Sequence, residues 1–194
     1  MLIWQKVNYI VDLQDRSSNN MISSEKDHLD KILAFLSEIG IDSLLESLSD
    51  QTFLPGLAMR SGVLVVDVDR LAYVGDVLHE AGHLACMPSE IRANMSDTLA
   101  NTDINNGGEM MAMAWSFAAC KHLGLEPNIV FHEAGYKGAA SNLIAMFENG
   151  GGLGVPLLQW NNMCYDIPSA ERNNQKPFPH MLKWTCDENK YITI

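Results

Sequence analysis

Two histidines stand four residues apart in residues 78–85, LHEAGHLA. Apolar residues recur at helical spacing over 74–84, which predicts that this stretch is a buried helix. Side chains four residues apart on a helix lie one turn above another, with Cβ atoms about 5–6 Å apart. His79 and His83 can therefore direct both imidazoles at one ion, and Glu80, turned about 100° around the axis, stands beside that ion.

The segments on either side of this helix also suggest a buried centre. Residues 62–68, GVLVVDV, form a β-branched apolar run of strand length just before it. Residues 109–123, EMMAMAWSFAACKHL, follow a polar, broken stretch and are apolar almost all the way round. We therefore expect a second buried helix, which begins at Glu109 and ends at Gly124.

Weaker patterns complete the predicted fold. The other predicted elements are a strand at 2–13, a helix at 24–39, a short helix near 41–48 and a helix at 142–148 with Ser141 as its N-cap. About the last forty residues are predicted to be irregular. With 194 residues and no Pro/Ser-rich linker, we expect one domain over 1–194. The predicted class is α+β, with a small, mostly antiparallel or mixed sheet packed on the two central helices.

Charge and composition limit the kinds of partner and the cellular location that we expect for this chain. The formal net charge is −11 and Lys and Arg form no cluster, so nucleic acid is not an expected partner. The first residues lack the features of a secretory signal, and no apolar run reaches roughly 18 residues, so we expect a cytoplasmic protein without a membrane segment. The cysteines, at 86, 120, 164 and 186, contain no C-x-x-C pair, and Cys86 and Cys120 are expected to pack as small apolar side chains.

The arrangement of His79, Glu80 and His83 suits metal-assisted hydrolysis. Zinc held by two imidazoles, a third protein ligand and one open position lowers the pKa of its water to roughly 7 and polarises a carbonyl. Glu80 would take the water's proton and pass it to the leaving amine. The other interpretation is that both imidazoles form hydrogen bonds within the core, where each buried ring would need partners.

The stretch VLHEAGHLA resembles the active-site helix of the zincin metallopeptidases, in which H-E-x-x-H lies behind a substrate-binding edge strand. The resemblance covers residues 62–123, about a third of the chain. The metzincin branch is excluded, because the positions three and six residues after His83 hold Cys86 and Ser89 rather than Gly and His. The resemblance implies a zincin-like fold, a zinc cofactor and, in the gluzincin branch, a glutamate ligand from a later helix.

Glu109 matches that gluzincin ligand, since it stands 26 residues after His83 at the start of the next long helix. A carboxylate leading into a buried helix would be costly without a partner, and a zinc ion supplies one. The other interpretation is a first-turn residue that favours the helix dipole. The competing ligands are Glu90, Asp97, Asp103 and His132.

Two departures from the gluzincins stand out. Met113 occupies the position where many gluzincins have an aspartate that holds the first histidine, so that acceptor must be Asp76, Asp97, Asp103 or a backbone carbonyl. The chain is also too short for the helical lobe of the larger peptidases and is closer in size to compact, single-lobed gluzincin-like proteins. Gly82 and the pair Gly107-Gly108 are expected to let the two helices approach.

Residues 131–138, FHEAGYKG, repeat four letters of the first motif. Tyr136 replaces the second histidine, and Gly135 and Gly138 favour a turn, so a second zinc site is not expected. Peptidases of this class need a donor for the oxyanion that forms opposite the zinc, and either Tyr136 or His132 is a candidate. The other interpretation is that His132 lies in an ordinary loop while Tyr136 packs on the edge of the core.

The sequence thus leads to a zinc-dependent hydrolase, a peptidase acting on a peptide or protein substrate. His79, His83 and Glu109 would bind zinc, Glu80 would act as the base, and Tyr136 or His132 would assist. The alternative is a non-proteolytic zinc-binding or regulatory protein on a zincin scaffold. A third hypothesis is a structural protein in which the motif is accidental.

Overall fold

The structure, a computed structural model, describes residues 21–49, 52–97 and 103–187, without the side chains of 103–106. This part of the chain is an α+β fold with eight α-helices, one 3-10 helix and three strands. In chain order they are α1 (Ser23–Glu38), β1 (Ser43–Leu45), β2 (Leu57–Arg60), β3 (Val63–Val66), α2 (Val74–Cys86), α3 (Ser89–Arg92), α4 (Asp103–Leu123), η1 (Pro127–Ile129), α5 (Glu133–Tyr136), α6 (Ala140–Glu148), α7 (Val155–Trp160) and α8 (Ile167–Asn173). The strand predicted at 2–13 lies outside the described residues.

The three strands form one small mixed sheet in the order β1-β3-β2. β1 runs parallel to β3, whereas β2 runs antiparallel to it with Met59 opposite Leu64. Ser61 and Gly62 connect β2 to β3 with φ angles of 49° and 78°, as a tight two-residue hairpin turn requires. The mixed sheet agrees with the prediction, and β2 forms one of its edges.

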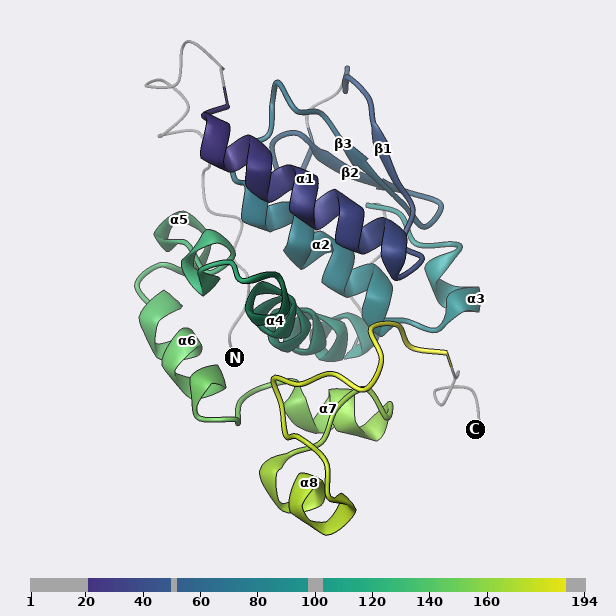
Figure 1. Ribbon diagram of the computed structural model, residues 1–194. Helices are drawn as coiled ribbons and strands as arrows, with labels where there is room; N and C mark the ends of the chain where they lie inside the picture. The colour runs from purple at the N-terminus through teal and green to yellow at the C-terminus, as the bar shows by residue number, and fades with distance from the viewer. Residues whose placement is uncertain (1–20, 50–51, 98–102, 188–194) are drawn as a thin grey trace.

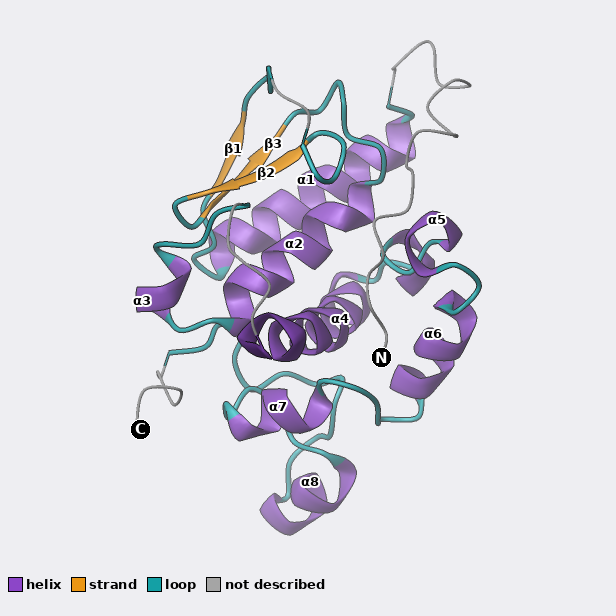
Figure 2. Ribbon diagram, turned by 180° about the vertical axis from the view of Figure 1, so that it is seen from behind, coloured by secondary structure: helices purple, strands orange, loops and turns teal. Residues whose placement is uncertain are grey.

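α2 is the central helix of the molecule (Figures 1 and 2). It packs against β3 and α1 on one side and against α4 on the other. Its apolar side chains Val77, Leu78, Ala81 and Leu84 are fully buried. The far side of α4 is covered by α6 and α7, with α8 beyond them (Figure 1). Residues 111–120 of this helix are all buried, as the apolar pattern of residues 109–123 predicts.

The prediction of a short helix near residues 41–48 is wrong. Residues Ser43–Leu45 form β1 instead, because Leu64 N–H donates to the Asp42 carbonyl at 3.0 Å and Glu46 N–H donates to the Val66 carbonyl at 3.1 Å. Pairing with β3 satisfies these backbone groups, whereas a two-turn helix is marginal without tertiary packing. All three residues of β1 are exposed, so the apolar spacing in this segment does not mark a buried helical face.

Other boundaries also differ from the prediction. α4 begins at Asp103, before the predicted start, so Gly107-Gly108 lies inside the helix. α6 begins two residues before the predicted start, with Ala139 rather than Ser141 at its N-cap position. α7 and α8 lie in the region predicted to be irregular. The Asp166 side chain accepts from Ser169 N–H at 2.8 Å and caps α8, a local signal that composition alone does not reveal.

Two further findings concern the described part of the chain. None of its helices combines the length and the apolar character needed to cross a bilayer. All four cysteines are buried, which agrees with the packing role predicted for Cys86 and Cys120.

Candidate metal centre

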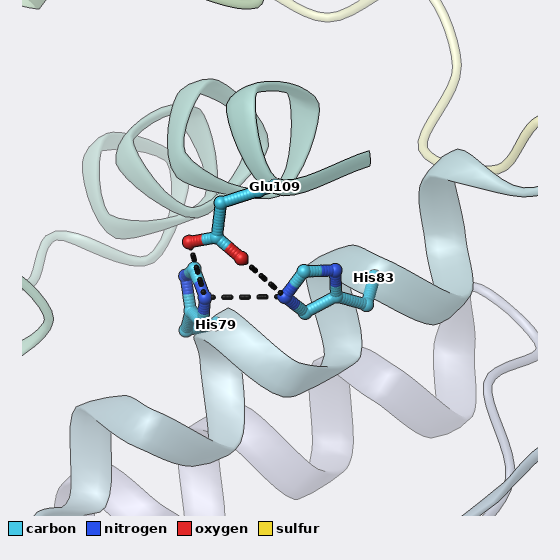
Figure 3. A group of neighbouring side chains, drawn as sticks. All are labelled: His79, His83 and Glu109. Carbon is cyan, nitrogen blue, oxygen red and sulfur yellow. Dashed lines mark hydrogen bonds and ion pairs between the residues drawn. The ribbon is translucent and has the colours of Figure 1, made fainter. Parts of the chain in front are cut away.

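The crossing of α2 and α4 sets the geometry of the site. Gly82 lies at this crossing, where a Cβ atom would stand 3.1 Å from the Ala112 carbonyl oxygen and 3.2 Å from the Ala112 Cα. Glycine costs roughly 1 kcal/mol relative to alanine inside a helix, and here it allows the two backbones to approach. Ala112 lies one turn after Glu109. The contact therefore holds Glu109 over the two histidines of α2 (Figure 3).

Three ligand atoms converge between the helices. The Nε2 atoms of His79 and His83 are 3.2 Å apart. The Glu109 carboxylate reaches both rings, with Oε1 3.3 Å from His79 Nε2 and Oε2 3.1 Å from His83 Nε2. The side chain of His79 is 5% exposed, against 21% for His83 and 25% for Glu109. Solvent therefore reaches the cluster from the side of His83 and Glu109.

Electrostatic attraction between the Glu109 carboxylate and the two histidines stabilises the cluster in the absence of an ion. Burial lowers the pKa of His79, but the adjacent Glu109 carboxylate outweighs it and raises that pKa to about 9. Burial acts to raise the pKa of Glu109, but the two histidines hold it well below its ordinary range. Glu109 is therefore ionised at neutral pH and supplies the negative charge that complements a bound cation.

The donor set and its dimensions fit a metal ion. Zinc binds imidazole nitrogen and carboxylate oxygen at about 2.0–2.2 Å, so tetrahedral ligands stand about 3.3 Å apart. The separations of 3.1–3.3 Å match this value. Glu109 Oε1 is buried and faces His79 Nε2 at 3.3 Å, so a cation between the two side chains would take the place of the proton that they share. His79, His83 and Glu109 can therefore hold a metal ion, and no other such group occurs among the described residues.

Glu80 lies on α2 beside the cluster and borders the sheet. It lines a small hollow that is partly open to solvent and whose other walls are Phe53, Leu54, Leu57, Ala58 and Asp97. Burial raises the pKa of Glu80, and His83 and His79 oppose this effect only in part. A carboxylate with a raised pKa is a better proton acceptor than an exposed one, so Glu80 has the electrostatics of a general base.

The second HEAG stretch packs on the first turn of α2. His132 Nδ1 accepts a hydrogen bond from Gly135 N–H at 3.1 Å, so the ring proton is on Nε2. That proton is donated to Asp76 Oδ1 at 2.9 Å, and the ring stacks on Tyr73 with centroids 3.9 Å apart. In this arrangement His132 gives its one ring proton to Asp76 and holds none for an oxyanion.

Tyr136 lies in the same region. Its ring packs against Phe131 and His132 at centroid distances of 5.1 and 6.5 Å. α5 spans only Glu133–Tyr136 and ends at Lys137 in the left-handed region, which confirms the predicted turn. The structure thus places Tyr136 and His132 together near the start of α2, outside the group of three ligands. A role of Tyr136 as the oxyanion donor stays a prediction.

Three of the four competing ligands lie outside the cluster. Asp97 Oδ1 accepts from Met59 N–H at 2.9 Å, His132 is bonded to Asp76, and Glu90 is exposed on α3. The side chain of Asp103 lies outside the described part. Because α4 begins six residues before Glu109, the first-turn interpretation of that residue is wrong.

Sequence reasoning missed the walls of the hollow, because it assigned no strand to β2. The dipeptide Ser61-Gly62 is a turn signal that could have revealed the β2–β3 hairpin. Leu57 and Ala58 would then have been expected near the helix that follows the hairpin. The pairing of Met59 with Asp97 spans 38 residues and leaves no local pattern.

Comparison of the chain with protein-family models, with curated proteins and with solved structures finds no match.

Proposed function

We propose that this protein is a zinc-dependent hydrolase that cleaves peptide or amide bonds, built on a compact scaffold of the zincin type. One observation carries the proposal: His79, His83 and Glu109 place three ligand atoms at the spacing of tetrahedral zinc, with Glu80 next to them. The donor set of two imidazoles and one carboxylate is the set used by catalytic zinc in several hydrolases.

In the proposed reaction each residue has a defined task. Bound zinc would polarise the scissile carbonyl and activate water. His79 and His83 would hold the ion as neutral ligands, and Glu109 would hold it as an anion. Glu80, whose pKa burial raises, takes a proton from the attacking water and returns it to the leaving amine.

Tyr136 is the proposed donor to the oxyanion, because the ring proton of His132 already serves Asp76. His132 then has a positioning role: it orients Asp76, whose negative charge raises the pKa of both His79 and Glu80. Tyr136→Phe is expected to lower kcat about 10²-fold, in the range seen for single oxyanion donors, without loss of zinc. An unchanged kcat would remove Tyr136 from the mechanism.

Zinc content and the Glu80→Gln variant test the proposal together. We expect about one equivalent of zinc in protein purified without chelators, and less than about half an equivalent would contradict the site. Glu80→Gln should keep the zinc and abolish hydrolysis of a mixed peptide pool followed by mass spectrometry. Glu133→Gln is the matched control, because Glu133 holds the equivalent place in the second HEAG stretch and bonds Gly138 N–H on the surface. Hydrolysis that survives in Glu80→Gln would refute the mechanism.

A second candidate function is zinc binding without hydrolysis. The observation that favours it is the occupied outer edge of β2, where Asp97 already bonds Met59. A zinc-loaded protein that cleaves no peptide in the pool under any condition tested would support this alternative.

A further inference from the structure

The outer edge of β2 is closed by the protein's own chain. β2 is an edge strand, and Met59 lies opposite Leu64 in the antiparallel ladder. Its N–H and C=O point away from β3, and one residue satisfies both: Met59 N–H donates to Asp97 Oδ1 at 2.9 Å, and Asp97 N–H donates to the Met59 carbonyl at 3.2 Å. Asp97 thus pairs with Met59 as a strand residue would, with its carboxylate in place of a peptide carbonyl.

Two more hydrogen bonds extend this pairing along the hairpin. Ser61 N–H donates to Ser96 Oγ at 3.2 Å, and Gly62 N–H donates to the Met95 carbonyl at 2.9 Å. Residues 95–97, which we call the strap, therefore run beside β2 without forming a regular strand. Two of the four bonds use side chains in place of backbone groups, so the strap is a weaker partner than a complete strand would be.

The strap ends at the hollow beside Glu80. Asp97 and Glu80 both line that hollow, together with Leu57 and Ala58 of β2. A peptide paired with the outer edge of β2 would therefore pass the proposed general base, and Asp97 stands in its way. The two carboxylates and the net charge of −11 favour a peptide that carries cationic side chains.

We propose that the strap is a built-in competitor for the outer edge of β2, and that an extended, cationic peptide segment binds there by displacing Asp97 from Met59. The position of the peptide rests on the proposed function, whereas the competition itself does not require hydrolysis. Strand addition would replace the side-chain contacts of the strap with regular backbone pairing.

The variants Asp97→Ala and Asp97→Asn separate the effect of the hydrogen bond to Met59 from the effect of the negative charge of Asp97. Both variants remove one negative charge, but the asparagine keeps a side-chain oxygen that can accept from Met59 N–H. Amide exchange followed by NMR should be about tenfold faster at Met59 in Asp97→Ala and near the wild-type rate in Asp97→Asn. Ser96→Ala, which removes only the acceptor of Ser61 N–H, provides a milder second variant if Asp97→Ala folds poorly. It should speed exchange at Ser61.

Binding is measured in the Glu80→Gln background, so that no turnover occurs. The probe is a fluorescent, end-capped decapeptide of alternating valine and lysine, compared with the same peptide N-methylated at alternate residues. Asp97→Ala should bind the unmodified probe about tenfold more tightly than Asp97→Asn does, and N-methylation should abolish this gain. Equal affinity in the two variants, equal binding of the methylated probe or unchanged exchange at Met59 would overturn the proposal. Because neither readout depends on zinc or cleavage, a protein without hydrolase activity would still give a clear result.

Discussion

At the scale of single residues, the site depends on one carboxylate placed against two imidazoles. Glu109 lies within 3.3 Å of both rings, and its charge raises the pKa of His79 to about 9 despite burial. The same charge that would hold a cation thus holds a proton when the cation is absent. Zinc and protons therefore compete for this cluster.

Glu109→Gln tests the ligand role of the carboxylate. The amide has the same shape but neither the charge nor a second oxygen, so zinc affinity should fall at least about 100-fold. Competition with a chromogenic chelator measures the affinity, with Glu133→Gln as the control of equal chemistry. Zinc affinity within about threefold of the wild type in Glu109→Gln would exclude Glu109 as a ligand.

The metal-free protein should lose stability at alkaline pH. The pKa of His79 is raised from its ordinary value of 6.5 to about 9, so its contribution is fully present below pH 6.5 and is lost as the pH rises through about 9. A charge-assisted hydrogen bond contributes about 1.5–3 kcal/mol, which sets the size of the loss. Urea unfolding of chelator-treated protein at pH 6.5 and 9.5 measures it.

Two comparisons check the assignment to His79. His79→Asn should show little of this alkaline loss, and the zinc-loaded wild type should not show it, because a metal-bound ring carries no extra proton. Glu109 has the opposite pH dependence, because its pKa is lowered from its ordinary value of 4.5. Its contribution to the free energy of unfolding is present above pH 4.5 and is lost as the pH falls through its lowered pKa. An identical alkaline profile in His79→Asn and the metal-free wild type would show that another group titrates.

At the scale of elements, the crossing of α2 and α4 decides whether the site exists. Gly82 and Ala112 approach so closely that an added Cβ meets backbone atoms rather than a flexible side chain. The histidines lie on α2 close to Gly82, and Glu109 lies on α4 one turn before Ala112. A small change in helix separation therefore changes all three ligand distances together.

Gly82→Ala should separate the helices and weaken zinc binding about tenfold or more. Gly107→Ala is the matched control: it is also a glycine within a helix, but its added Cβ would meet only Leu157 Cδ1, at 3.8 Å. The control should be neutral or stabilise by up to about 1 kcal/mol from helix propensity. Isothermal titration with zinc and urea unfolding report the two effects. If both variants bind zinc equally, the close contact does not position the ligands.

The same elements show what the sequence could predict. α2 and α4 were predictable because burial and helical period coincide in them, and the site followed because H-E-x-x-H and Glu109 lie on these helices. β1 was mistaken for a helix because its pairing with β3 depends on a partner 21 residues away in the ladder. β2, three residues of which are buried, has no alternating pattern, and Asp97 joins it through contacts that no local period encodes.

At the scale of the whole molecule, Arg92 joins three parts of the chain. Its guanidinium donates to the Leu84 carbonyl at 2.8 Å, to the Met87 carbonyl at 3.0 Å and to the Cys186 carbonyl at 3.2 Å. These bonds cap the end of α2 and tie the C-terminal segment to it. The strap begins three residues after Arg92, so the same anchor also fixes its starting point.

Arg92→Ala should destabilise the protein by about 2–3 kcal/mol, because it leaves three carbonyl groups without their charged donor. Arg60→Ala is the control, since its ion pair with Glu46 is exposed on both sides and should contribute less than about 1 kcal/mol. Thermal and urea unfolding measure both variants. Equal stability of the two would show that Arg92 does not anchor the C-terminal segment.

Selection would act on the α2–α4 crossing as one heritable unit. A lineage that replaced Gly82 with a larger residue would lose the alignment of Glu109, and Glu109 would then be free to drift. Related sequences should therefore divide into those that keep Gly82, a small residue at position 112 and Glu109 together, and those that have lost all three. The crossing would then mark, in any newly found relative, whether the metal site is still maintained.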